Sequence, residues 1–197
     1  MKKTFKLAVF IFALISALTI FSSCSGSASG GADDLVFKTS DGKEISLYMQ
    51  RDEVEEILGK GEEPQSGMAT AQYDGFSLGY TEGLLSLINI ESDGIKTKSG
   101  LTVGASADKA KSLSSYDDNY MFAYYSYDED ENKYTLLEGE SMENSKKIQD
   151  ELNKHREIKD KIKKYASISC QLDSDKNIRR ILISDYYTGL YYYVDKY

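Results

Sequence analysis

Residue types that commonly build catalytic or metal sites are scarce in this sequence. Its 197 residues include one histidine, two cysteines, one proline and no tryptophan. A single histidine excludes metal sites built from several histidines, and neither a Cys-x-x-Cys nor a His-Glu-x-x-His motif occurs. A Ser-His-Asp triad would have to use His155, which lies in a charged, helix-forming segment. We therefore expect His155 to be an ordinary helix-face residue, and we expect no metal and no cofactor.

The two cysteines are Cys24 and Cys170, and only Cys170 lies in the body of the chain. With a single cysteine, the body cannot form an internal disulfide. An exported body therefore has to be stable through its core. Cys170 alternates with Ile168 and Leu172, which predicts a strand with these three side chains inward. Nothing nearby in the sequence would lower the pKa of the thiol, so we expect a buried, unreactive cysteine.

Positive charge is also in short supply. Lysine and arginine together number 24 against 32 acidic residues, which gives a net charge of -8. Nucleic-acid binding requires a basic surface, so this composition excludes a nucleic-acid partner. An acidic body suits a location close to an anionic envelope without adhesion to it.

The only long apolar run is residues 7–21, which follows Lys2, Lys3 and Lys6. A bilayer-spanning helix needs about 20 apolar residues, and this run is shorter. Basic residues followed by an apolar run of this length, closed by small residues, are typical of a secretory signal. We therefore assign residues 1–23 to a signal peptide.

Residues 21–24, Phe-Ser-Ser-Cys, resemble the lipobox of bacterial lipoproteins, with Phe21 in place of the usual leucine. The resemblance implies cleavage before Cys24 and attachment of a diacylglycerol to its thiol. A flexible Gly/Ser tether over residues 24–33 would then hold the body away from the membrane. The alternative is a secreted protein without lipid, in which Cys24 is a free thiol.

Residues 34–96 predict a first structural unit. Apolar residues alternate between 36 and 47 around a Ser-Asp-Gly turn, which indicates a hairpin. Val54, Ile57 and Leu58 recur with the period of a helix, which Gly59 ends. Strands then follow around two hairpin-like dipeptides, Asp74-Gly75 and Glu82-Gly83.

Residues 97–197 predict a second, longer unit. Segment 97–113 aligns with 43–58 at a shift of 56 residues, which indicates an internal duplication; a chance match of two strand–turn–helix units is the alternative. After a hairpin with an acidic turn, an amphipathic pattern predicts a helix over about 141–164, and its apolar residues form one narrow stripe. A further hairpin and a last strand, 189–197, complete the unit. The expected fold is α+β, with two related helix-plus-antiparallel-meander units forming a curved sheet and one extra long helix in the second unit.

This order of elements is similar to that of two groups, the SmpA/OmlA envelope lipoproteins and the beta-lactamase-inhibitor-protein-like (BLIP-like) domain. The resemblance implies a curved sheet that can bind another protein, and it implies no enzyme. The residues that carry it are 45–47, 52–59 and 83–90 in the first unit and 100–104, 108–113 and 172–183 in the second.

The acidic turns 128–132 and 173–177 have oxygen-bearing side chains at the first, third and fifth positions of a calcium loop. Lys133 and Ile178 occupy the sixth position, where an EF-hand has glycine, and neither turn has the closing glutamate. We interpret both turns as solvated hairpin tips, with calcium binding as the alternative.

Tyrosine is abundant, with 16 residues. Tyr124 and Tyr125 lie in one predicted strand, and Tyr191 and Tyr193 lie in the last one. Alternation along a strand sends neighbours to opposite faces, so some of these rings are expected outside. Tyr191, Tyr193, Tyr124 and Tyr125 are therefore candidates for a contact surface, and packing in the core is the alternative.

From the sequence we expect a lipid-anchored binding or envelope-interaction module on the extracytoplasmic face of a cell membrane or outer membrane, without catalytic activity. The expected partners are the membrane, through the N-terminal lipid, and an envelope or secreted protein; a glycan is less favoured. The alternatives are an inhibitor or chaperone of a secreted enzyme and an acid-based hydrolase of envelope material.

Overall fold

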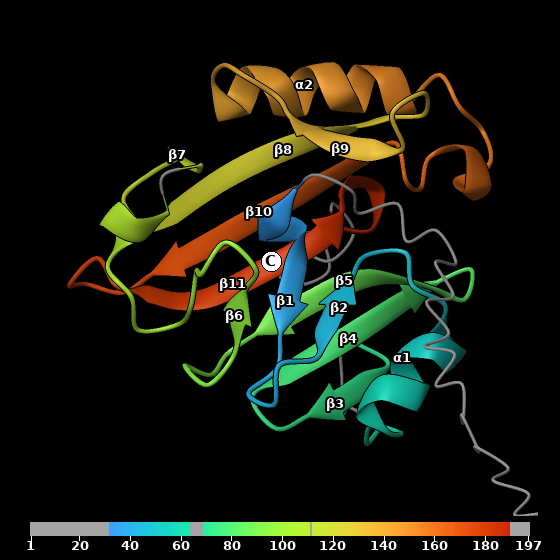
Figure 1. The fold of residues 1–197 in the computed structure, drawn as a ribbon. Helices are drawn as coiled ribbons and strands as arrows, with labels where there is room; N and C mark the ends of the chain where they lie inside the picture. Colours follow the sequence, from blue (N-terminus) through green and yellow to red (C-terminus); the bar gives the residue numbers. More distant parts are fainter. Residues whose placement is uncertain (1–31, 64–68, 111, 190–197) are drawn as a thin grey trace, which may run out of the picture.

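The computed structural model describes residues 32–63, 69–110 and 112–189. These residues form a mixed α+β fold of two antiparallel sheets with short helices (Figure 1). The strands are β1 (Val36–Lys38), β2 (Glu44–Ser46), β3 (Ala71–Tyr73), β4 (Phe76–Thr81), β5 (Leu84–Ile90), β6 (Lys96–Thr97), β7 (Ser114–Ser115), β8 (Tyr120–Asp128), β9 (Lys133–Leu136), β10 (Tyr165–Leu172) and β11 (Ile178–Asp185). The helices are α1 (Arg51–Leu58) and α2 (Ser141–Leu152), with 3-10 turns η1 (Asp33–Leu35), η2 (Ala107–Lys109) and η3 (Ile158–Asp160).

The larger sheet has eight strands in the order β3-β4-β5-β11-β10-β8-β7, and β9 also pairs with β8. The smaller sheet has the order β2-β1-β6 and lies in front of the larger one in Figure 1. Every strand pair is antiparallel. The expectation of an α+β body with antiparallel meanders is therefore confirmed.

One face of the large sheet, here called the core face, packs against the small sheet and α1. It is apolar because alternate residues of neighbouring strands fall in register: Ile88 pairs with Ile183, and Ile183 with Ile168. Ile168, Cys170 and Leu172 are all buried, as the alternation predicted. Leu35, Phe37, Ile45 and Leu47 close this core from the other side.

The opposite face, here called the far face, carries serine and asparagine in place of isoleucine. Asn89 Nδ2 donates a hydrogen bond to Ser77 Oγ at 3.2 Å, and the Ser167 and Ser184 hydroxyls share one at 3.1 Å. Helix α2 packs on one part of this face, where Tyr124, Ile148, Leu152 and Tyr186 form a second buried cluster. A covered polar face is stable when its groups are paired in this way.

The predicted first helix is confirmed as α1. A reciprocal capping box, in which Gln50 and Glu53 bond to each other's backbone, begins it. Gly59 ends it with a positive φ of 79°, a conformation that favours glycine. The hairpins at turns 40–42, 128–132 and 173–177 also form where the pattern placed them.

The helix predicted over about 141–164 is shorter than expected, since α2 ends at Leu152. Its sheet-facing residues are Ile148 and Leu152. A helix continuing for twelve more residues would advance about 18 Å, away from the position where Tyr165 must pair with Ser126 at the start of β10. The chain therefore turns back through η3.

The strand–helix unit predicted over 97–113 is wrong in its helix. The structure has only the three-residue turn η2 there. Gly100 and Gly104 have positive φ angles of 97° and 83°, so the chain turns where a regular strand was expected. Its apolar residues Leu101, Ala110 and Leu113 reach the core through these turns. The described residues do not show two repeated units.

Candidate functional site

The residues predicted to carry function fall into two groups. Cys24, Tyr191 and Tyr193 lie outside the described residues. Tyr124 and Tyr125 are buried, with exposed fractions of 8% and 3%, so neither ring forms an exposed surface of the folded chain. Tyr124 packs under α2 and Tyr125 packs in the main core, because alternation places one on each covered face of the sheet.

Tyr125 helps to fix the start of the body. Its hydroxyl donates to Asp34 Oδ2 at 2.8 Å, and the hydroxyls of Ser99 and Ser112 donate to the same carboxylate. Burial and the nearby Asp34 charge raise the pKa of Tyr125. This cluster attaches η1 to the large sheet, so its role is structural.

A second buried carboxylate, Asp185, joins three segments at the other end of the core. Its Oδ2 accepts from Tyr48 Oη at 3.0 Å and from the Lys163 backbone N–H at 2.9 Å, and its Oδ1 accepts from the Thr188 N–H at 3.1 Å. Complete burial raises the pKa of Asp185 to about 6, against the lowering effect of these donors. Tyr48 and Lys163 both have left-handed backbones, with φ of 67° and 69°. Asp185 therefore holds two strained positions in place.

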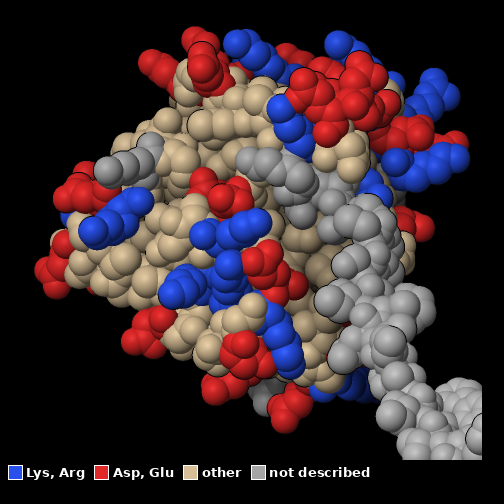
Figure 2. All heavy atoms as spheres, in the orientation of Figure 1, with Lys and Arg blue, Asp and Glu red and all other residues tan. Residues whose placement is uncertain are grey.

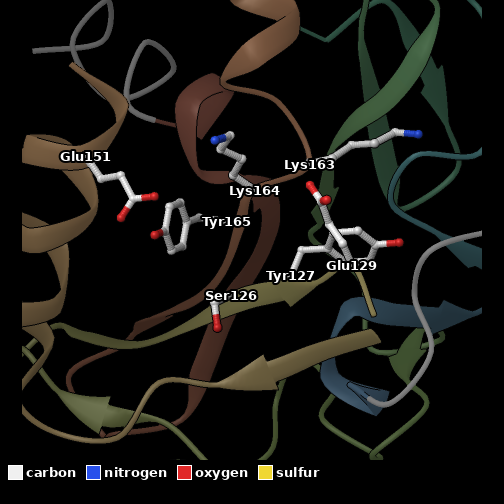
Figure 3. A pocket seen from close by; sticks show the side chains of 7 residues that line it. All are labelled: Ser126, Tyr127, Glu129, Glu151, Lys163, Lys164 and Tyr165. Atoms are coloured by element: carbon white, nitrogen blue, oxygen red, sulfur yellow. The ribbon is translucent and has the colours of Figure 1, made fainter. Parts of the chain in front are cut away.

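Beside Lys163 lies a cavity of about 370 Å³, here called the polar cavity (Figure 3). It is formed where β8 ends, α2 ends and β10 begins. Figure 3 shows Glu151 and Glu129 on opposite sides of it, with the side chain of Lys164 between them and that of Lys163 directed away. Its lining consists of Ser126, Tyr127, Glu129, Glu151, Lys163, Lys164 and Tyr165.

Several groups of the polar cavity are held by neighbours. Burial and a hydrogen bond to Glu151 raise the pKa of Tyr165 to about 12. Lys164 Nζ donates to His155 Nε2 at 3.0 Å, so the single histidine of the sequence lies next to this cavity. Tyr127 Oη donates to Asn132. The cavity thus offers an ammonium group, two carboxylates and phenol groups. Such a lining can hold a polar ligand that carries both a positive and a negative group.

The surroundings of the polar cavity are strongly charged. Figure 2 shows acidic side chains gathered at the turn between β8 and β9, with lysine and arginine beside them. Residues 128–131 of this turn are all exposed acids. A cationic group on a partner would therefore be attracted towards the mouth of the cavity.

The two acidic turns have the geometry of hairpin tips. Asp128 Oδ1 accepts from the N–H groups of Asp130 and Glu131 at 3.0 and 3.1 Å. Asp173 Oδ1 accepts from those of Asp175 and Asn177, both at 2.9 Å. The leading carboxylate of each turn is thus used by the turn itself. No group of three or more potential His, Cys, Asp or Glu ligands occurs in the part of the chain that the structure describes.

Cys170 is fully buried, and burial raises the pKa of its thiol to about 12, so the thiolate is not formed at neutral pH. The prediction of a buried cysteine is confirmed. The polar cavity, in contrast, was missed by the sequence interpretation. Glu129, Glu151 and Lys164 come from three separate segments, and nothing in their local spacing signals that they meet.

No protein-family model, curated protein or solved structure matches this chain. The SmpA/OmlA-like and BLIP-like resemblance therefore stays a hypothesis based on the order of elements. Within residues 32–63, 69–110 and 112–189, no helix is long and apolar enough to cross a membrane.

Proposed function

We propose that this protein is a lipid-anchored, extracytoplasmic binding module without catalytic activity. We further propose that it recognises a short polar segment, carrying both charges, on an envelope or secreted protein. The observation that carries this proposal is the polar cavity, which presents Lys164 between Glu129 and Glu151 beside two tyrosines.

The size and lining of the cavity support this ligand class. A volume of about 370 Å³ lies within the range of small-ligand sites, about 300–1,000 Å³. A ligand carboxylate would pair with the Lys164 ammonium, and a ligand amine with Glu129 or Glu151. The Tyr127 and Tyr165 rings supply contact area with little loss of side-chain entropy. An inhibitor or chaperone of a secreted enzyme, and an acid-based hydrolase, stay as alternative hypotheses.

Peptide binding tests the cavity directly. The probe is an end-blocked peptide, Lys-Gly-Ser-Gly-Glu, compared with end-blocked Ser-Gly-Ser-Gly-Ser, followed by NMR chemical shifts of the Tyr165 and Lys164 amides. We expect only the charged peptide to shift these signals, and Lys164→Gln to weaken its binding about tenfold, which corresponds to loss of one charge-assisted contact. Lys146→Gln, on the exposed side of α2, is the matched control and should bind as the unaltered protein does. Identical responses to both peptides would refute the proposal.

The anchor is tested separately. Cys24→Ala should move the protein from the membrane to the soluble fraction of cells, or stop its maturation, because the acylated thiol is lost. Ser25→Ala is the control and should stay with the membrane. Membrane association of the Cys24 variant equal to that of the control would remove the lipid anchor from the proposal while leaving the cavity untouched.

The finer description of the fold is also a proposal. Residues 71–90 form the meander β3-β4-β5, and β8, β10 and β11 form another set of neighbours in the sheet. The last strand of each set, β5 and β11, meet antiparallel in the middle of the sheet. This arrangement supports, for the sheet alone, the two related units expected from the sequence.

A further inference from the structure

A second hollow, here called the edge pocket, lies at the border of the large sheet and has a volume of about 210 Å³. On the side of β8 away from β10, β7 pairs with Met121 and Phe122, and β9 pairs with residues 125–128. The edge pocket opens between these two partner strands, where α2 begins (Figure 1). Its walls include Phe122, Tyr124, Leu136, Glu138, Ser141 and Asn144.

Large hydrophobic side chains that stay exposed lie in or next to the edge pocket. Within the described residues they are Tyr116, Leu136 and Met142, with exposed fractions of 52%, 40% and 63%. Leu136 lines the pocket, and Met142 directly follows Ser141, which also lines it. The Tyr116 ring packs edge-on against Phe122 of the wall, with 5.4 Å between the ring centroids. Apolar side chains gathered at a hollow, unlike scattered ones, indicate a surface for another protein.

The rim of the edge pocket is acidic. Glu138 lines the pocket, and Glu140 and Glu143 are exposed at the start of α2. None of the residues described as lining the pocket is basic. Lys147 Nζ lies 3.9 Å from Glu143 Oε2, but both side chains are more than two-thirds exposed, so this ion pair is weak. A cationic group on a partner is therefore attracted to the rim.

The first turn of α2 adds hydrogen-bond donors to one wall. The N–H groups of residues 141–143 cannot bond within the helix, whose first bond joins the Asn144 N–H to the Glu140 carbonyl at 3.0 Å. Glu140 is the N-cap residue of this described helix, and its side chain forms no capping hydrogen bond. The backbone carbonyl oxygen of a bound protein segment is an acceptor that matches these donors.

We propose that the edge pocket binds a protein segment in which a large apolar side chain is followed directly by lysine or arginine. The hollow is smaller than small-molecule sites, which are about 300–1,000 Å³, and its size suits a single inserted side chain. The apolar side chain enters beside Phe122 and Leu136, as anchor residues do at the centre of protein interfaces. The basic residue meets Glu138, and the adjoining backbone carbonyl meets the N–H groups of α2.

This inference goes beyond the proposed function, because the edge pocket and the polar cavity lie at opposite ends of α2. Ser141 lines the edge pocket and Glu151 lines the polar cavity. Ten residues of α-helix advance about 15 Å. Binding at one site can therefore be found or refuted without deciding the other.

Three end-blocked peptides test the proposal on the full chain. They are Gly-Ser-Phe-Arg-Ser-Gly, here called the Phe-Arg peptide, and the same sequence with serine in place of phenylalanine or with glutamate in place of arginine. We expect the Phe-Arg peptide to shift the NMR signals of Leu136 and Asn144, and the serine peptide to leave them unchanged because it cannot fill the pocket. The glutamate peptide should bind about tenfold more weakly, since it brings a like charge to Glu138.

Three results of this experiment would overturn the proposal. One is that the Phe-Arg peptide leaves the signals of Leu136 and Asn144 unchanged, and another is that all three peptides bind equally. The third is that only Lys164 and Tyr165 respond, which would place the peptide in the polar cavity.

Substitutions at exposed positions then locate the contact. Leu136→Asn should weaken binding of the Phe-Arg peptide about fivefold, because part of the apolar wall is lost. Thr135→Asn is the matched control: it is the neighbouring exposed residue of β9, its side chain points to the opposite face, and it should bind as the unaltered protein does. Glu138→Gln should reduce the preference for the Phe-Arg peptide over the glutamate peptide. Melting curves check that each variant is folded.

The occupant is decided by the same measurements. Equal affinities of the two β9 variants, or an unchanged charge preference in Glu138→Gln, would overturn the proposal. Signals of Leu136 and Asn144 that shift with protein concentration alone would also overturn it, because a second copy of the chain would then fill the pocket.

Discussion

The two faces of the eight-stranded sheet are built from the same strands but are stabilised differently. On the core face, Ile88, Ile183 and Ile168 lie in register and exclude water by apolar contact. On the far face, serine and asparagine alternate with them and are satisfied by hydrogen bonds between neighbouring strands. Burial is similar on both faces, so the comparison shows that a low exposed fraction does not by itself identify the source of stability.

Neighbouring residues on β11 give the strongest test of this difference. Ile183→Ala should cost about 3 kcal/mol of unfolding free energy, because it removes a fully buried side chain and leaves a cavity. Ser184→Ala, one residue later on the far face, should cost about 1 kcal/mol, the value of one hydrogen bond. Denaturant titration measures both. Comparable losses of unfolding free energy for the two variants would show that the two faces are not stabilised differently.

Asp185, a fully buried carboxylate at the end of β11 on the core face, sharpens the comparison through pH. Burial raises the folded pKa of Asp185 from its usual 3.8 to about 6, so the folded state holds the proton more tightly. The stabilisation is therefore fully present below pH 3.8 and is lost as the pH rises through 6. The difference of about two pKa units corresponds to about 3 kcal/mol.

Asp185→Asn is the variant that isolates this effect. The stability of the unaltered protein relative to the variant should fall by up to this amount between about pH 4 and 7, because the variant has no proton to lose. Denaturant titrations across that range give the difference. A relative stability that is constant, or that rises with pH, would contradict the raised pKa.

An effect smaller than those at Ile183 and Asp185 is expected for Asn89 on the far face. Asn89→Ala removes a donor to Ser77 and an acceptor for Arg180, and it should cost about 1–2 kcal/mol. Asn119→Ala, at an exposed turn position, should change stability by less than about 0.5 kcal/mol. Equal values for the two asparagines would show that hydrogen bonding does not stabilise the far face.

Local features of the fold could be predicted from the sequence, whereas those that depend on distant contacts could not. The helical period of apolar residues and the stop at Gly59 located α1, and alternation placed Cys170 inward. The end of α2 at Leu152 depends on where β10 must pair with β8, which no local pattern encodes. The segment with Gly100 and Gly104 resembles a strand in composition but turns in the structure.

The candidate site was less predictable than the fold. Tyr124 and Tyr125 were singled out because alternation along a strand sends neighbouring rings to opposite faces, yet both faces of the sheet are covered there, so neither ring is exposed. The polar cavity brings together residues from three segments, the end of β8, the end of α2 and the start of β10, of which the closest two are 12 positions apart in sequence (Glu151 and Lys163). A charged residue is ordinary at each of these positions taken singly. The residues form one site only because the pairing of β8 with β10 and the packing of α2 bring them together.

The pairing of β5 with β11 has a consequence for the order in which the protein assembles. It joins Ile88 to Ile183, which are 95 positions apart in the chain, whereas the hairpins on either side form between near neighbours. Closing so long a loop has an entropy cost that nearby contacts must first offset, and folds with such pairings are slow. We expect each set of hairpins to form early and the central join to come last. On the export route that we propose, a chain emerging from a secretion channel would expose the edge of β5 until β11 has crossed, which makes this stage the one most open to mispairing.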